Sequence, residues 1–252
     1  MAGKKMSDAT GPAPLPRVVP PLLSFVAGYV DSITFLALFG FFAAQVTGSF
    51  VVAAAEIVVD DRGVAAKLLA IPVFMLGAGI AAAIIIARRG SKHSSLPLVF
   101  ALETLLLAGF TGLMLYSWPV DDPDSWRVAA AGLLSAAAMG VQSTLVRLLL
   151  RGVPQTNVMT GNSTQLAIDA TELIYAIFRP ARVAADTALA VQVAEARKRF
   201  ATVFMVLIGF LVGAMGGALA YAFTGPWSAC AAILVVAALI AWSAIRGGID
   251  PV

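Results

Sequence analysis

Six long apolar stretches are the feature that most constrains how this chain can fold. A helix needs about 20 apolar residues to cross the hydrocarbon core of a bilayer. Only 12% of the 252 residues are charged, whereas soluble domains carry about a quarter. The sequence therefore predicts an all-α integral membrane protein surrounded by lipid. The six stretches that satisfy the length criterion are residues 18–40, 64–87, 96–118, 127–150, 200–223 and 226–245.

Two further apolar stretches, 47–60 and 160–178, are less suited to spanning the bilayer. The first is cut short by the Asp60-Asp61-Arg62 cluster, and the second carries several polar side chains. We expect both to be short helices that are broken or re-entrant at membrane depth.

The two halves of the chain repeat one pattern. Gly28 and Gly40 have the same spacing as Gly140 and Gly152, and each pair is followed by a Thr-Gly-polar triplet. The offset that aligns the triplets also places Glu56 on Asp169. This register predicts an internal duplication. Its parts are a first membrane repeat at 18–118, an acidic external loop at 119–126 and a second membrane repeat at 127–246.

The topology depends on whether the two short helices cross the membrane. If they do not, the chain has six spans and the repeats are inverted; if they do, it has eight spans and the repeats are parallel. Cytoplasmic loops are enriched in Lys and Arg. The six-span arrangement places more of the 17 lysines and arginines in the cytoplasm, and it puts both termini there. Six spans are therefore predicted, with eight as the alternative.

Three polar segments lie outside the predicted spans. We expect residues 1–17 to be a disordered cytoplasmic tail and residues 247–252 to be a short second tail. Between them, residues 180–199 alternate apolar and charged side chains. That pattern is typical of a cytoplasmic amphipathic helix at the membrane surface, and an ordinary solvated connector is the alternative.

The Thr-Gly triplets are the predicted centre of the functional site. Irregular backbone at membrane depth is tolerated only inside protein or beside a water-filled cavity. Interrupted helices at matching positions of two repeats mark the binding site of many transporters, and their N-termini carry partial positive charge. The predicted substrate-binding residues are Asp31, Thr47, Gly48, Ser49, Gln142, Thr160, Gly161, Asn162 and Gln165.

Carboxylates within or near the apolar stretches are the predicted coupling groups. Burying one at a helix centre costs about 2.5–3.5 kcal/mol, and few basic residues lie at matching depth. We therefore expect such acids to be protonated, to bind a cation or to face water. The candidates are Asp31, Asp169, Glu56 and Glu103.

Small residues recur every four positions at Gly209, Gly213 and Gly217. Such a stripe lets two helices approach closely, within the chain or across a homodimer. The single cysteine and the single histidine give no basis for a disulfide framework or a metal site. No enzyme motif and no cofactor motif is present, and the basic residues are too dispersed to predict a nucleic-acid surface.

The segments GYVDSITFLALFG and VTGSF, followed by AMGVQSTLVRLLLRG and NVMTGNSTQLA, resemble the YoaK family of bacterial multi-pass membrane proteins. The resemblance extends from about Pro20 to Ile245. Its members usually have Thr-Gly-Asn at the first triplet, where this chain has Thr-Gly-Ser. The resemblance implies a location in the bacterial inner membrane, and it implies no particular activity.

These observations favour a small secondary transporter or permease for a small polar or ionic solute, with coupling to protons or a cation as a further expectation. Its site would lie at the membrane midplane between the two triplets. One alternative is a non-transporting membrane scaffold or regulator, and a second is an intramembrane enzyme acting on a lipid or quinone. A polar cavity beside the triplets would distinguish transport from a scaffold.

Overall fold

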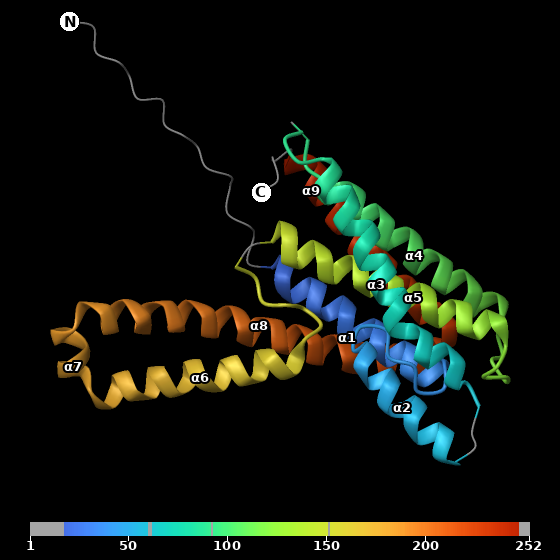
Figure 1. The fold of residues 1–252 in the computed structure, drawn as a ribbon, viewed down its shortest axis with the longest axis horizontal. Coiled ribbons are helices and arrows are strands. Elements are labelled where there is room, and N and C mark those ends of the chain that lie inside the picture. Colours follow the sequence, from blue (N-terminus) through green and yellow to red (C-terminus); the bar gives the residue numbers. More distant parts are fainter. Residues whose placement is uncertain (1–17, 60–61, 92, 151, 247–252) are drawn as a thin grey trace, which may run out of the picture.

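The computed structural model describes residues 18–59, 62–91, 93–150 and 152–246; the two predicted tails lie outside these residues. The described residues fold into helices and contain no strand (Figure 1). The elements are α1 (Val19–Ala37), α2 (Val46–Val59), α3 (Val64–Ala87), α4 (Leu96–Tyr116), α5 (Trp126–Leu149), α6 (Met159–Phe178), α7 (Pro180–Ala185), α8 (Thr187–Thr224), the 3₁₀ turn η1 (Gly225–Ala229) and α9 (Cys230–Arg246).

Five helical stretches are long and apolar enough to cross a membrane. Four of them are α1, α3, α4 and α5, and the fifth runs from Thr187 to Ala244. The fifth stretch contains both α8 and α9, because η1, with Pro226 in its first turn, divides it. Each of the six predicted spans therefore coincides with a helix, and the prediction of an all-α multi-pass membrane protein is confirmed.

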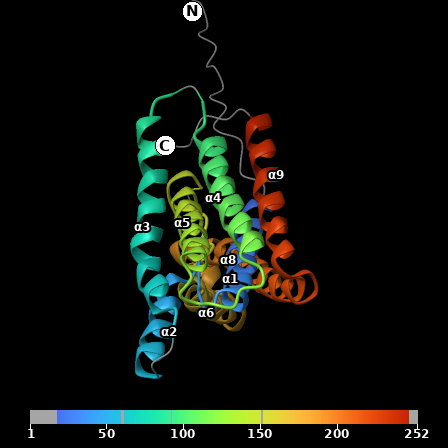
Figure 2. The same cartoon turned by 90° about the vertical axis from the view of Figure 1, so that its right-hand side faces the viewer.

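The long helices form one bundle from which a hairpin extends. In Figures 1 and 2, α3, α4, α5 and α9 lie side by side, and α1 runs antiparallel to α5. The start of α1 and the end of α9 lie at the same end of the bundle. The first half of α8 pairs with α6, and together they project away from the bundle.

Glycine contacts hold α1 against α8. A Cβ atom on Gly28 would overlap the backbone of Phe210, so the two helices touch backbone to backbone. The predicted stripe forms the other side of this crossing, because its three glycines contact the carbonyl oxygens of α1. Because α1 already covers the stripe, these three glycines do not form a homodimer interface. A homodimer through another surface stays a prediction. The contacting pairs are Gly209 with Pro21, Gly213 with Phe25 and Gly217 with Tyr29.

The crossing of α3 and α5 has the same construction. Gly140 of α5 lies against the backbone of Phe74 and Ala78, and Gly77 of α3 lies against the carbonyl oxygen of Ala137. Without a side chain on either glycine, the two backbones approach closely and gain dispersion contacts over the whole crossing. Two glycine-based crossings therefore join α1 to α8 and α3 to α5.

Three residues after the end of both α1 and α5, the chain turns at a glycine in the left-handed backbone region. Gly40 has φ +80° and Gly152 has φ +78°, a conformation that other residues adopt only with strain. After each turn the chain continues without regular structure to the next helix start, at Val46 for α2 and at Met159 for α6. Much of this irregular backbone is buried: Ala43 and Thr156, for example, are 0% exposed.

The predictions for the two shorter helices need correction. Neither α2 nor α6 is broken internally; the interruptions lie in front of them. In addition, α6 has 20 residues, one more than α1, so it is not short. The predicted connector at 180–199 is not a separate element either, because α7 covers its start and the rest belongs to the unbroken 38-residue α8.

Candidate functional site

The two triplets stand in the first turns of α2 and α6, and the segments before these helices meet. Asn157 Nδ2 donates a hydrogen bond to the Ala44 carbonyl oxygen over 3.5 Å. The triplets also fix the segments that precede them. Ser49 Oγ accepts from Phe42 N at 2.9 Å and donates to the Phe42 carbonyl. Asn162 Nδ2 donates to the Gln155 carbonyl at 2.7 Å.

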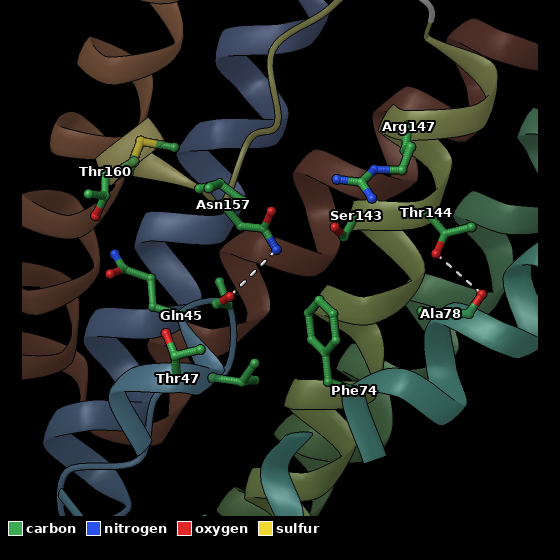
Figure 3. A pocket seen from close by; sticks show the side chains of 13 residues that line it. Gln45, Thr47, Phe74, Ala78, Ser143, Thr144, Arg147, Asn157 and Thr160 are labelled. Atoms are coloured by element: carbon green, nitrogen blue, oxygen red, sulfur yellow. Dashed lines mark hydrogen bonds between the residues drawn. The ribbon is translucent and has the colours of Figure 1, made fainter. Parts of the chain in front are cut away.

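A pocket of about 430 Å³ lies where the two helix starts converge, and we call it the junction pocket (Figure 3). Figure 3 shows Thr47 and Thr160 on one side of it and Ser143 and Arg147 of α5 on the opposite side. Side chains of both halves of the chain therefore share one space. The lining residues are Ala44, Gln45, Val46, Thr47, Phe74, Ala78, Ser143, Thr144, Arg147, Asn157, Val158, Met159 and Thr160.

The junction pocket has a positive electrostatic character. None of the described residues that line it is acidic. Arg147 is exposed there, and in the described part of the chain no ion pair involves it. The N-termini of α2 and α6 both open on the pocket, and each contributes partial positive charge from unpaired N–H groups. The arrangement suits an anion or the negative end of a polar solute.

Asp31 does not line the junction pocket; its carboxylate fastens the segment in front of α2. The carboxylate accepts from Ala44 N at 2.6 Å and from Gln45 N at 3.2 Å. Asp31 also lines a second pocket, of about 310 Å³, which we call the α1–α8 pocket. It is lined by Asp31, Ser32, Phe35, Leu36, Phe42, Gln45, Phe210, Ala214 and Ala218. Gln45 is common to the two pockets.

We expect Asp31→Asn to loosen the start of α2, because the amide oxygen can replace only one of the two carboxylate acceptors. A buried N–H left unpaired costs about 1–3 kcal/mol. Hydrogen exchange should accelerate at residues 42–48 and stay unchanged in α4. Ser32→Ala, a change at the neighbouring residue that leaves this carboxylate in place, is the matched control. Unchanged exchange at 42–48 would contradict the anchoring role.

The other predicted binding residues act mainly as structural contacts. Gln142 is buried beside α1, where its Nε2 donates to the Leu23 carbonyl and to Thr156 Oγ1, both at 2.9 Å. Gly48 lets the Phe42 ring approach, since a Cβ there would lie 2.8 Å from the ring. Gly161 is adjacent to the junction pocket without lining it. Of the predicted binding residues, Thr47 and Thr160 line the junction pocket.

Two of the predicted coupling acids have cationic partners, so the expectation that such acids lack a basic partner is wrong for them. Asp169 is 0% exposed, and the Arg199 guanidinium donates to it through Nε at 2.9 and 3.1 Å. Gln165 Nε2 donates to the same carboxylate at 2.9 Å. Glu56 receives two bonds from Lys67 Nζ, at 2.6 and 2.8 Å. These acids stabilise the α6–α8 and α2–α3 contacts.

Glu103 fits the expectation of an unpaired acid. It lies in α4, is 0% exposed, and neither carboxylate oxygen has a hydrogen-bond partner in the part of the chain that the structure describes. It lines neither of the two pockets described above. As for metals, the described residues bring no three His, Cys, Asp or Glu side chains together as ligands.

The predicted site leaves out polar residues that line the junction pocket, namely Ser143 and Arg147 of α5 and Asn157 in front of α6. Arg147 attracts attention only as a charge near the end of an apolar stretch, and Asn157 belongs to a segment without periodicity. The available signal was the repeat register, because Ser143 follows Gly140 at the distance at which Asp31 follows Gly28. That register marks position 143 as the counterpart of a buried carboxylate.

Comparison with known proteins identifies a family and no individual relative. Neither the curated proteins nor the solved structures give a match. A family model described as protein of unknown function (DUF1275) matches residues 21–243, which is nearly the whole described chain. The protein is therefore a multi-pass membrane protein that belongs to the family of unknown function DUF1275.

Proposed function

We propose that this protein is a small secondary transporter or permease for a polar or ionic solute, and that the junction pocket is its binding site. The observation that carries the proposal is that the starts of α2 and α6 converge on one pocket of about 430 Å³. Irregular backbone inside a membrane protein is tolerated when it is buried or lines a cavity, and both conditions hold here. A closed bundle with both triplets packed against lipid would have favoured the scaffold alternative, whereas Thr47 and Thr160 line a pocket and support transport.

Inverted repeats are the architecture we propose for this transporter. Three features support them: the antiparallel directions of α1 and α5, the matching glycine contacts at the two crossings and the shared position of the two triplets. Each crossing joins a helix of one half to a helix of the other. Movement of the α1–α8 pair against the α3–α5 pair would then open the junction pocket to alternate sides, as in other inverted-repeat transporters. We place both termini in the cytoplasm and the protein in the bacterial inner membrane.

Of the four candidate acids, we propose a coupling role for Glu103 and Asp31 and not for Asp169 and Glu56. Glu103 has no hydrogen-bond partner among the described residues, and Asp31 has backbone donors, whereas Asp169 and Glu56 are each bonded to a cation. A proton or a cation bound at Glu103 would remove the cost of its buried charge.

Flux into proteoliposomes tests the proposal without assuming a substrate. Stopped-flow light scattering would compare protein-free and protein-containing vesicles with glycerol, urea, alanine, sodium lactate and potassium chloride. We expect at least one solute to enter faster with the protein, and Thr160→Trp to slow that entry at least tenfold by filling the pocket. Thr164→Trp, an exposed position one turn further along α6, is the matched control and should retain the flux.

The proposal fails if vesicles that contain folded protein admit none of these solutes faster than empty vesicles. It also fails if Thr160→Trp and Thr164→Trp leave the flux equal, because the solute would then not pass the junction pocket. Glu103→Gln tests coupling separately, since it should remove the pH dependence of the flux and leave the protein folded.

A further inference from the structure

The junction pocket and the α1–α8 pocket have matching walls. Phe74 and Ala78 of α3 line the first, and Phe210 and Ala214 of α8 line the second. These are the same residues that the glycines of α5 and α1 contact at the two crossings. A further wall comes from α5 in the first pocket and from α1 in the second, and the segments in front of the shorter helices complete each pocket. The two pockets are therefore equivalent positions of the repeated architecture.

The two equivalent pockets differ in charge. Counting from the contacting glycine, Asp31 in the α1–α8 pocket corresponds to Ser143 in the junction pocket, and Phe35 corresponds to Arg147. In the α1–α8 pocket, the Asp31 carboxylate occupies the backbone N–H groups in front of α2. Among the described residues that line the junction pocket, no carboxylate takes that place in front of α6, and Arg147 contributes a cation.

Asn157 supplies an independent observation in the junction pocket. It lines the pocket, is 7% exposed, and its Oδ1 has no hydrogen-bond partner among the described residues. Figure 3 shows its side chain extending from the segment in front of α6 toward α5, where Ser143 and Arg147 lie. A buried acceptor without a donor is costly, and a donor group on a bound solute would remove that cost.

We propose that the junction pocket binds a small carboxylate that also carries a hydroxyl or amino group. The carboxylate lies at the N-terminus of α6 beside Arg147, where the chain itself places Asp31 in the equivalent pocket. The hydroxyl or amino group donates to Asn157 Oδ1. This inference names the substrate class of the proposed transporter and rests on that function for the location of the site.

Equilibrium binding of radiolabelled lactate to the purified full-length protein in dodecylmaltoside, at constant ionic strength, tests the inference. We expect saturable binding that propanoate displaces more weakly than unlabelled lactate, because propanoate lacks the donor. Arg147→Gln should weaken binding about ten- to a hundredfold, as expected for the loss of a charge-assisted hydrogen bond. Arg182→Gln, an exposed arginine of α7, changes the net charge equally and should bind as the wild type does.

A second variant places a carboxylate in the junction pocket at the position equivalent to Asp31. Ser143→Asp introduces the carboxylate that the equivalent pocket already contains, and we expect it to abolish lactate binding while the protein stays monodisperse. Thr171→Asp, exposed on α6, adds the same charge outside the pocket and should leave binding intact. Because Ser143→Asp keeps Arg147, loss of binding in both variants would not reflect a single damaged residue.

The inference is overturned if lactate does not bind, if both pocket variants bind as the wild type does, or if inorganic phosphate binds where lactate does not. Equal affinities for lactate and propanoate overturn the role of Asn157. Lactate binding in detergent without solute entry into vesicles would support the carboxylate site and contradict the proposed transport function. Flux that is sensitive to Thr160→Trp, without any lactate binding, would support transport through the junction pocket and contradict the carboxylate site.

Discussion

Replacing Gly140 by alanine should destabilise the protein by about 3 kcal/mol, at the upper end of the range for overpacking. The added Cβ would overlap the Phe74 carbonyl oxygen, and its neighbours there are backbone atoms that cannot rotate aside. The crossing of α3 and α5 must therefore widen along its length. The midpoint of heat-induced loss of the monodisperse peak, measured in detergent by size-exclusion chromatography, should fall clearly below that of the wild type.

Gly79→Ala is the matched control for this substitution. Gly79 lies in α3, only two residues from Gly77, and a Cβ there meets nothing within 4 Å. Alanine in a helix interior is favoured over glycine by about 0.5–1 kcal/mol, so this variant should melt at or slightly above the wild-type midpoint. If both variants melt alike, backbone contact does not determine the stability of the crossing. Gly28→Ala, at the matching position of α1, should behave like Gly140→Ala.

Arg199→Met should have a comparable effect, about 3 kcal/mol, because it leaves the Asp169 carboxylate without its cationic partner. Removing one member of a buried ion pair typically costs about 3–5 kcal/mol. The lower end applies here, since the Arg199 side chain is 42% exposed and water partly screens the pair. We expect α6 to separate from the first half of α8, which protease digestion and hydrogen exchange in α6 would detect.

The double variant Arg199→Met with Asp169→Asn distinguishes an unpaired charge from lost packing. Removing the carboxylate should restore much of the stability, since no buried charge then remains. Arg197→Met, an exposed arginine two residues earlier in α8, should leave the stability unchanged. If the double variant is no more stable than Arg199→Met alone, the ion pair contributes through the packing of its aliphatic parts and not through its charge.

The helices could be predicted from the sequence because a bilayer requires long apolar segments, and this chain marks their ends. Asp60 and Asp61 close one stretch, Gly40 and Gly152 end two others, and the Thr-Gly triplets stand at helix starts. The crossing partners could not be predicted. A glycine stripe states only that some backbone comes close, and the sequence does not say that α1 supplies it.

The sequence predicted only part of the candidate site. Thr47 and Thr160 could be placed together because the repeat gives them equivalent positions. Asp169 and Arg199 lie 30 residues apart in sequence. They belong to the two helices of the α6–α8 hairpin, and only the register of α6 against α8 brings them together. The periodicity of one helix contains no information on its register against another, so this acid looked unpaired.

The backbone contact between Gly28 and α8 has a consequence for biosynthesis. A ribosome adds about 5–20 residues per second, so roughly 10–40 seconds pass between synthesis of the first helix and of the one on which it packs. During that interval the groove that the glycine leaves in α1 faces lipid or the insertion machinery. The nascent α1 must remain in the membrane before α8, the helix on which it packs, has been synthesised. The α1–α8 crossing therefore forms only when most of the chain has been translated.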